Sequence, residues 1–320
     1  MRILITGGNG QLGVYITSLL LKQGHTIGIY DKVFDNEYLS PTAKSQIQYI
    51  QGDLMNPTSI YECVSQFKPE IIYHLAGLLS LTSEANPQET VNVNGIGTFY
   101  VLEAARLFKV RQVIFVSTLL TFDKDIQKHN IDEFTLQRPS TIYGINKLYG
   151  ELLGCYYKEK YGLDFRAIRL STVIGPEAKI RHISIFNIWM IEKSFFGKAC
   201  EVFVPEETIS PLIYYKDAAN ALIQLSDAPL EQIKAVCYNV SSYRVSAKEM
   251  AEHVKRGIPN AKITFNPDAE IIKLQKSRGP FIYDCSKALQ EWGWKPTYTL
   301  EEMVIDFCNE LEKSKYTEIS

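Results

Sequence analysis

MRILITGGNGQLG, residues 1–13, changes abruptly from an apolar run to glycines and then to a helical pattern. Arg2–Thr6 is short, mostly apolar and rich in isoleucine and leucine, as in a buried strand. From Gln11 to Leu21 apolar residues recur at helical spacing; Gly7 and Gly10 lie in the turn before this helix, and Gly13 lies in its first turn. Glycines let a backbone approach a pyrophosphate, and a helix N-terminus offers it unpaired N–H groups. The stretch therefore predicts a dinucleotide site.

A second apolar run, Thr26–Tyr30, ends in the acidic residue Asp31. A carboxylate there accepts hydrogen bonds from the adenosine ribose and repels a 2′-phosphate, which favours NAD over NADP. Lys32 follows directly and weakens this preference, because a cation tolerates a phosphate. The alternative is that Asp31 is only a solvated residue at a strand end.

Length and composition limit the class of protein. A chain of 320 residues, 46% hydrophobic, fits one large domain or a domain with a smaller lobe. The net charge of −2 does not suggest binding to a polyanion, so we expect no nucleic acid partner. The six cysteines show no metal-ligand spacing, so we expect reduced thiols and no metal. The first strand begins too early for a targeting peptide, and no apolar run approaches the ~18 residues of a membrane span. We expect a cytoplasmic protein that does not bind membranes.

Strand and helix patterns alternate through the first half of the chain. We expect strands at 2–6, 26–30, 47–50, 70–75, 111–118 and 164–170, helices at 11–21, 58–67, 88–109 and 140–161, and a loop at 121–138. This alternation predicts an α/β fold with a Rossmann-type doubly wound parallel sheet, whose ligands lie at the carboxyl ends of the strands.

After residue 175 the pattern becomes irregular. We expect helices at 183–196, 214–225, 246–255 and 300–311, and a strand at 236–240 that returns to the sheet. Residues 1–175 would form the NAD-binding domain. Residues 176–320 would form a smaller mixed C-terminal substrate lobe, built mainly from 176–212 and 241–320.

Three residues carry candidate chemistry. Tyr143 and Lys147 lie four apart on the helix expected at 140–161, so they share one face, and Thr118 ends the strand expected at 111–118. A free tyrosine has a pKa near 10, but an ammonium group one turn away and a positive nicotinamide stabilise its phenolate. Lowering that pKa by about three units requires roughly 4 kcal/mol. Thr118 would hold a substrate hydroxyl while Tyr143 takes its proton and the cofactor takes the hydride.

Over nearly its whole length the chain resembles the extended short-chain dehydrogenase/reductases, also called NAD-dependent epimerase/dehydratases. The glycine motif at 6–13, the pair at 53–54, the strand ends at 74–77 and 116–118, and Asn94 within V-N-G-I-G-T match that family. The resemblance implies that the catalytic residues are Thr118, Tyr143, Lys147 and Asn94. It implies cofactor contacts from Gly7, Asn9, Gly10, Gln11, Leu12, Gly13, Asp31, Lys32, Asp53, Leu54, Leu75, Ala76, Gly77, Asn94, Tyr143 and Lys147. It also implies a homodimer through the helices 88–109 and 140–161. We interpret His74 as a packed strand residue rather than an acid or a ligand.

Two subfamilies compete. Nucleotide-sugar enzymes usually carry R-Y-x-N-V-Y-G-P, whereas residues 169–176 here place Thr172 at the Asn position. The segment 210–217 also lacks the arginine that binds phosphate in those enzymes. Stretches at 74–80, 138–144, 151–154, 211–214 and 238–240 resemble short-chain-type L-threonine 3-dehydrogenases, in which Ser80 would touch the substrate. Their G-T-T-D-Y-A segment is replaced at 179–184, where Arg181 could bind a carboxylate or a phosphate, and Arg278 has the same two interpretations.

We therefore predict NAD-dependent oxidation of a secondary alcohol in a small hydroxy acid such as L-threonine. Substrate contacts are expected from Ser80, Thr118, Tyr143, Thr172, Arg181 and Arg278. The first alternative is an epimerase or dehydratase acting on a UDP- or dTDP-sugar, and the second is an NAD-binding protein without turnover.

Overall fold

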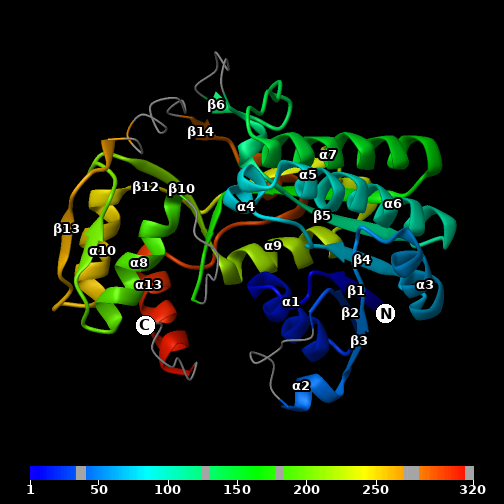
Figure 1. Ribbon diagram of the computed structural model, residues 1–320, viewed down its shortest axis with the longest axis horizontal. Coiled ribbons are helices and arrows are strands. Elements are labelled where there is room, and N and C mark those ends of the chain that lie inside the picture. Colours follow the sequence, from blue (N-terminus) through cyan, green and yellow to red (C-terminus); the bar gives the residue numbers. More distant parts are fainter. Residues whose placement is uncertain (34–40, 124–129, 177–182, 270–271, 273–280, 314–320) are drawn as a thin grey trace.

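The first strand, β1 (Arg2–Thr6), is buried on both faces: Ile3, Leu4 and Ile5 point to alternate sides and are at most 1% exposed. Strands of this kind belong in a parallel sheet covered by helices on both faces. The computed structural model describes residues 1–33, 41–123, 130–176, 183–269, 272 and 281–313, and shows such a sheet with a smaller lobe beside it (Figure 1).

The main sheet has seven strands in the order β11-β7-β5-β4-β1-β2-β3, and every neighbouring pair is parallel. The other strands are β2 (Thr26–Asp31), β3 (Ile47–Gln51), β4 (Ile71–His74), β5 (Gln112–Thr118), β7 (Asp164–Leu170) and β11 (Cys237–Val240). The strand order reverses between β1 and β4, which is where open α/β sheets bind ligands. The predicted α/β, Rossmann-type fold is confirmed.

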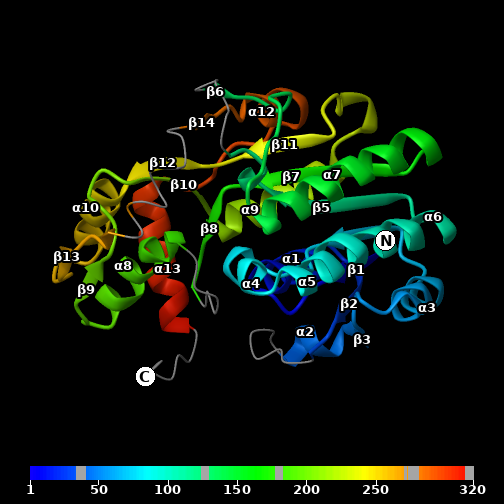
Figure 2. The same cartoon turned by 45° about the horizontal axis from the view of Figure 1, so that its top comes forward.

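Alternating residues of the same strands divide between two cores. On one face they pack with α1 (Gln11–Lys22), α9 (Tyr215–Asp227) and α12 (Ser286–Trp292). On the other face they pack with α3 (Pro57–Phe67), α6 (Gly97–Leu107) and α7 (Ile142–Tyr161), and Figure 2 shows α6 and α7 running side by side. Asn56 caps α3 by accepting a hydrogen bond from the Thr58 N–H at 3.1 Å, with Pro57 at the first helical position.

The helix expected at 88–109 is interrupted. The chain forms α5 (Pro87–Thr90), then a π-helical turn, η1 (Val91–Ile96), and only then α6. Such turns insert an extra residue and often occur at functional sites, and here the turn carries Asn94. The helix expected at 140–161 begins later, at Ile142, because Thr141 caps it by accepting from the Gly144 N–H at 3.1 Å.

The smaller lobe contains a three-stranded mixed sheet and a two-stranded sheet with their own apolar core. Its elements are β8 (Thr172–Ile174), η3 (Ile183–Ile185), α8 (Phe186–Phe195), β9 (Cys200–Val202), β10 (Ile209–Tyr214), β12 (Tyr243–Ser246), α10 (Ala247–Gly257), β13 (Ile263–Phe265) and α13 (Leu300–Lys313). Ser246 and Glu249 form a capping box at the start of α10.

The expectation of a plain loop at 121–138 is wrong. Within it the short strand β6 (Asn130–Ile131) pairs in parallel with β14 (Ile282–Tyr283), which ties this segment to the C-terminal part of the chain. The remaining short elements are α2 (Pro41–Ser45), α4 (Ser80–Ala85), η2 (Leu119–Thr121) and η4 (Leu230–Gln232). No helix among the described residues has the length and apolar character needed to cross a membrane.

Candidate active site

The turn after β1 has room only for glycine at two positions. Gly7 has a φ of +70°, and a Cβ there would lie 2.7 Å from the backbone of Ala76 at the end of β4. A Cβ on Gly13 would lie 2.7 Å from the Cα of Gly8, so α1 packs directly on the turn. The first turn of α1 has no side-chain cap from Gly10, which leaves N–H groups for an anion. This geometry fits the pyrophosphate of a dinucleotide.

Two predicted cofactor residues in this turn have their side chains engaged elsewhere. The Gln11 amide donates to the Pro176 carbonyl, and the Asn9 amide donates to the Val33 carbonyl. Leu12 is half-buried against the core. Gln11 thus links the start of α1 to the chain that follows β8.

The acidic residue at the end of β2 is already part of the turn. Asp31 accepts from the Asn9 N–H at 3.1 Å through Oδ2 and from the Lys32 N–H at 2.7 Å through Oδ1. The Lys32 ammonium pairs with Asp53 at 3.2 Å, and Leu54 is buried against Gly97. The predicted adenosine-binding residues Asp31, Lys32 and Asp53 therefore lie together at the carboxyl edge of the sheet.

Asn94 holds the chain that leaves β4. Its Oδ1 accepts from the Leu78 N–H at 2.7 Å, and its Nδ2 donates to the Leu78 carbonyl at 2.9 Å. A Cβ on Gly77 would lie 3.0 Å from Asn94 Oδ1 and 3.6 Å from Lys147 Nζ. Leu75, Ala76 and Gly77 thus pass directly beside Asn94 and Lys147, as expected of a nicotinamide site.

His74 lies in a chain of hydrogen bonds beneath this loop. Thr98 donates to the Asn94 carbonyl at 2.6 Å, so it accepts from His74 Nε2 at 2.9 Å, and His74 Nδ1 then accepts from Thr6 at 2.7 Å. Burial and the Lys147 charge lower the pKa of His74 to about 3, so the ring is neutral. These contacts support the interpretation of His74 as a packed structural residue.

The three candidate catalytic residues come from β5 and α7. Thr118 ends β5, and Tyr143 and Lys147 are 8% and 5% exposed on one face of α7. Lys147 Nζ donates to the Val116 carbonyl at 2.8 Å and lies 5.9 Å from the centre of the Tyr143 ring. Thr118 Oγ1 accepts from the Leu120 N–H at 3.2 Å, which fixes its rotamer.

Burial controls the protonation of this pair. It raises the pKa of Tyr143 to about 12 and lowers the pKa of Lys147 to about 8. The side chains around Tyr143 therefore do not by themselves produce the lowered Tyr143 pKa that the sequence predicts. It has to come from a further positive charge close to the phenol.

The predicted substrate residues are only partly described. Ser80 starts α4, and Thr172 lies in β8 opposite Leu212; both are half-buried. Glu84 of α4 accepts from the Tyr143 N–H at 3.5 Å, so α4 lies against the first turn of α7. The predicted contacts Arg181 and Arg278 lie outside the described residues.

Glu84 and a buried ion pair between Glu151 and Arg169 were not predicted from the sequence. Glu151 could have been noticed, because it follows Lys147 by four residues on the same helix. Arg169 carried a second signal, as one of two arginines in the buried strand β7. Glu84 gave none, because α4 itself was not predicted.

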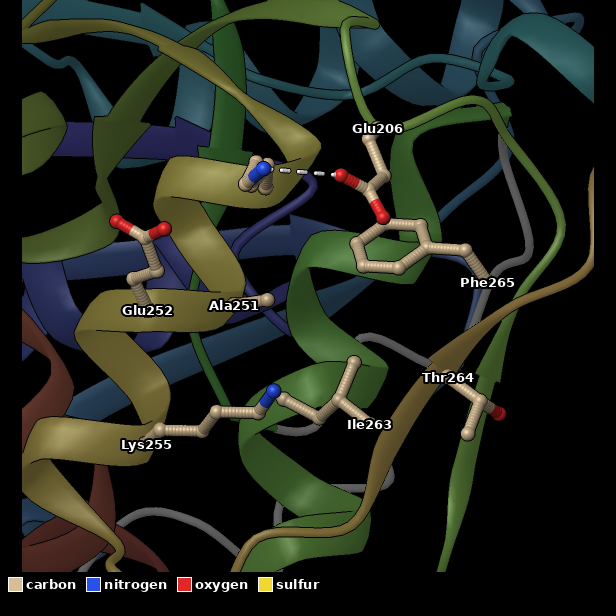
Figure 3. A pocket seen from close by; sticks show the side chains of 8 residues that line it. Glu206, Ala251, Glu252, Lys255, Ile263, Thr264 and Phe265 are labelled. Carbon is tan, nitrogen blue, oxygen red and sulfur yellow. Dashed lines mark ion pairs between the residues drawn. The ribbon is translucent and has the colours of Figure 1, made fainter.

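A surface cavity of about 370 Å³ lies elsewhere, in the smaller lobe (Figure 3). Its walls come from α10, β13 and Glu206, and charged side chains such as Lys255 and Glu252 face it alongside Phe265. α10 and β13 are on the far side of the lobe from β1 and β4 (Figure 1), so this cavity is separate from the glycine turn and from Tyr143.

Comparison with known proteins agrees with this geometry. The NAD dependent epimerase/dehydratase family matches residues 3–241 of the chain. The mitochondrial L-threonine 3-dehydrogenase of Bos taurus is 30% identical over 316 residues, which cover 96% of this chain and 82% of the relative. An uncharacterized epimerase/dehydratase of Staphylococcus saprophyticus is 30% identical over 328 residues, which cover 99% of each chain.

A solved structure extends the similarity to three dimensions. L-threonine 3-dehydrogenase from Trypanosoma brucei superposes with a TM-score of 0.88 at 26% identity, covering 98% of this chain and 97% of that one. The glycine turn, the acidic end of β2 and the residues beside Gly77 also fit NAD. This chain therefore belongs to the NAD-dependent epimerase/dehydratase family and is an NAD-dependent enzyme of the extended short-chain dehydrogenase type.

Proposed function

We propose that this enzyme oxidises the secondary alcohol of a small hydroxy acid, with L-threonine as the first candidate. The observation that carries the proposal is the Thr118, Tyr143 and Lys147 arrangement in a chain 30% identical to a named L-threonine 3-dehydrogenase. Residue 172 is Thr where nucleotide-sugar enzymes have Asn, and the segment 210–217 lacks their phosphate-binding Arg. Both differences support a small substrate.

Each catalytic side chain has a defined task in this proposal. When bound, NAD supplies the hydride acceptor and a positive nicotinamide ring. The Tyr143 phenolate takes the proton of the substrate hydroxyl, and Thr118 orients that hydroxyl toward it. Lys147, held by the Val116 carbonyl, keeps its ammonium group 5.9 Å from the centre of the Tyr143 ring and would bind the nicotinamide ribose. Asn94 keeps the β4 loop in place by its two bonds to Leu78.

The experiment is a substrate panel with purified protein and NAD, monitored by NADH absorbance. L-threonine and related β-hydroxy acids are expected to give net NADH, and Tyr143→Phe is expected to abolish it while NAD binding persists. No NADH across the panel would contradict the proposal. Activity that survives in Tyr143→Phe would remove that residue from the mechanism.

The second candidate is epimerisation or dehydration of a UDP- or dTDP-sugar, which the family name and the staphylococcal relative favour. It requires thermal stabilisation by UDP or dTDP, and a redox cycle that releases no NADH. Stabilisation by a hydroxy acid but by neither nucleotide would exclude it. A non-catalytic NAD-binding role fits only if no substrate of either kind turns over.

The same proposal divides the chain at residue 175. Residues 1–175, together with the strand at 236–240, would bind NAD, and residues 176–320 would bind the substrate. The apolar core of the smaller lobe supports a separate substrate lobe, although α9 and α12, which follow residue 175, pack on the main sheet. Ser80 and Thr172 are the described candidates for substrate contact, and Arg181 and Arg278 remain predictions from the sequence. All six cysteines are free thiols, which supports a reducing compartment such as the cytoplasm.

We further propose that the enzyme is a homodimer. Ile145, Tyr149, Leu152 and Tyr156 repeat at heptad spacing on the outer face of α7 and are 47%, 41%, 62% and 50% exposed. Such a stripe is the pattern with which two helices pack against each other. Ile96, the last residue of η1 directly before α6, is also exposed, so exposed apolar residues occur on both segments expected at the interface.

A further inference from the structure

A buried carboxylate one turn beyond Lys147 joins three segments of the chain. Glu151, on α7, is 2% exposed. It accepts from Arg169 Nε at 3.0 Å and Nη2 at 2.7 Å, from the Gln137 amide at 3.0 Å, and from the Ser117 hydroxyl. We call these four residues the Glu151 cluster. Its carboxylate is therefore fully bonded and fixed in position, which is the condition under which a buried charge is tolerated.

The Glu151 cluster has members on β5 and α7, the two elements that carry the three catalytic residues. Ser117 directly precedes Thr118 at the end of β5. Glu151 lies one helical turn from Lys147, which itself lies one turn from Tyr143. Arg169 lies on β7, which pairs with β5 in a register that sets Ser117 opposite Arg169. A change in this cluster thus reaches the strand end and the helix that carry the chemistry.

Glu151 also affects the charge of Lys147. The ammonium donates to the Val116 carbonyl and lies 4.9 Å from the centre of the Phe115 ring and 5.9 Å from that of Tyr143. The titratable groups that interact with its charge are the neutral His74 on β4 and Glu151 on its own helix. Among these, only Glu151 is an anion. Burial lowers the pKa of Lys147, and the Glu151 carboxylate opposes that effect.

We propose that Glu151 is a positioning residue that keeps Lys147 protonated beneath Tyr143 and fixes the end of β5 through Ser117. The inference rests on the role proposed above for Lys147. Without the carboxylate, a lysine in this buried position would lose its proton near neutral pH and could no longer stabilise a phenolate. The charges that face Glu151 are Arg169 on β7 and Lys147 on α7, and the Cys155 and Cys237 thiols are also near it.

The test is the charge state of Lys147 itself. We would titrate the ¹⁵N-labelled lysine Nζ resonances by NMR in the wild-type enzyme and in Glu151→Gln, and assign Lys147 with Lys147→Met. Glutamine keeps the shape and can still accept from Arg169, but it carries no charge. The pKa of Lys147 is expected to fall by about one unit or more, and the alkaline limit of NADH formation should fall with it. An unchanged Lys147 pKa would overturn the inference.

A matched control separates charge from stability. Asp164 and Arg166 form a second buried ion pair on β7, at 2.8 Å and at the opposite end of the strand. Asp164→Asn should lower the melting temperature without moving the Lys147 titration. If Glu151→Gln does not fold, the variant Glu151→Gln with Arg169→Met removes both charges and should show the same direction of shift.

The readouts also keep two failures apart. The titration measures Lys147 whether or not a substrate is turned over. An enzyme that oxidises no hydroxy acid but shows the expected shift would refute the proposed substrate and retain the role of Glu151.

Discussion

Replacing His74 with leucine should change how stability depends on pH. The pKa of His74 is lowered to about 3 in the folded protein, against an ordinary value of about 6.5 in the unfolded chain. Below about pH 6.5 the unfolded chain binds a proton that the folded chain does not, so stability is lost as the pH falls toward 3. At about pH 4.5, two units below the unfolded pKa, the loss from this residue is about 3 kcal/mol.

Leucine fills the site but neither titrates nor bonds to Thr6 and Thr98. His74→Leu should therefore be less stable than wild type by roughly 2 kcal/mol near neutral pH, because it leaves the Thr6 hydroxyl without its acceptor. This difference in the free energy of unfolding should shrink or reverse at acid pH, because only wild type loses stability by keeping the His74 ring neutral.

The assay is urea unfolding of wild type and His74→Leu at about pH 7 and about pH 4.5, with free energies compared by linear extrapolation. Thr98→Val serves as the control, because it removes a bond of the same chain but keeps the histidine, and it should retain the wild-type acid sensitivity. Equal losses in wild type and His74→Leu between the two pH values would refute a buried neutral His74.

Three further predictions concern binding and assembly. Gly13→Ala places a Cβ 2.7 Å from the Cα of Gly8 and should weaken NAD binding at least about tenfold by calorimetry; unchanged affinity would mean that the turn can shift freely. Asp31→Ala should raise the Kd for NAD about tenfold and reduce the difference between the Kd values for NAD and NADP. The reason is that the variant lacks the carboxylate that binds ribose hydroxyls and repels a phosphate. Leu152→Glu should convert the proposed dimer to a monomer in light scattering. The control Leu289→Glu changes a leucine on α12 that is 54% exposed and should leave the dimer intact. A dimer that persists in Leu152→Glu would exclude the α7 interface.

The sequence was most informative where one local rule decides the structure. The parallel strands were predictable from continuous apolar runs, and the start of α3 from Asn56 and Pro57, because burial and capping depend on neighbouring residues. The glycine turn was predictable for the same reason. Gly7 and Gly13 have no space for a side chain, and their spacing in the sequence indicates this requirement.

The missed elements depend on distant partners. β6 consists of two residues, and it becomes a strand only because β14, about 150 residues later, lies beside it. β8, β10 and β12, of three, six and four residues, come from three separate segments of the chain that form one sheet. The π-helical turn at Asn94 lies within a stretch whose apolar spacing is that of one continuous helix, so periodicity could not reveal it.

In the candidate site, too, locally spaced residues were predictable and features that depend on distant partners were not. The sequence predicted Thr118, Tyr143 and Lys147 as catalytic residues, because their order and spacing are local signals. It did not predict that burial raises the pKa of Tyr143 to about 12, since burial depends on how α7 packs against β5. Nor did it identify Glu151, whose partners Arg169 and Gln137 come from other elements.

The central claim is that Tyr143 is the base of an NAD-dependent alcohol oxidation. The most direct measurement is NADH formation with L-threonine and a panel of β-hydroxy acids, run with wild type and Tyr143→Phe after both are shown to bind NAD with equal affinity. We expect NADH formation by wild type and none by the variant. Equal rates in the two proteins, or no NADH from wild type with any hydroxy acid, would contradict it.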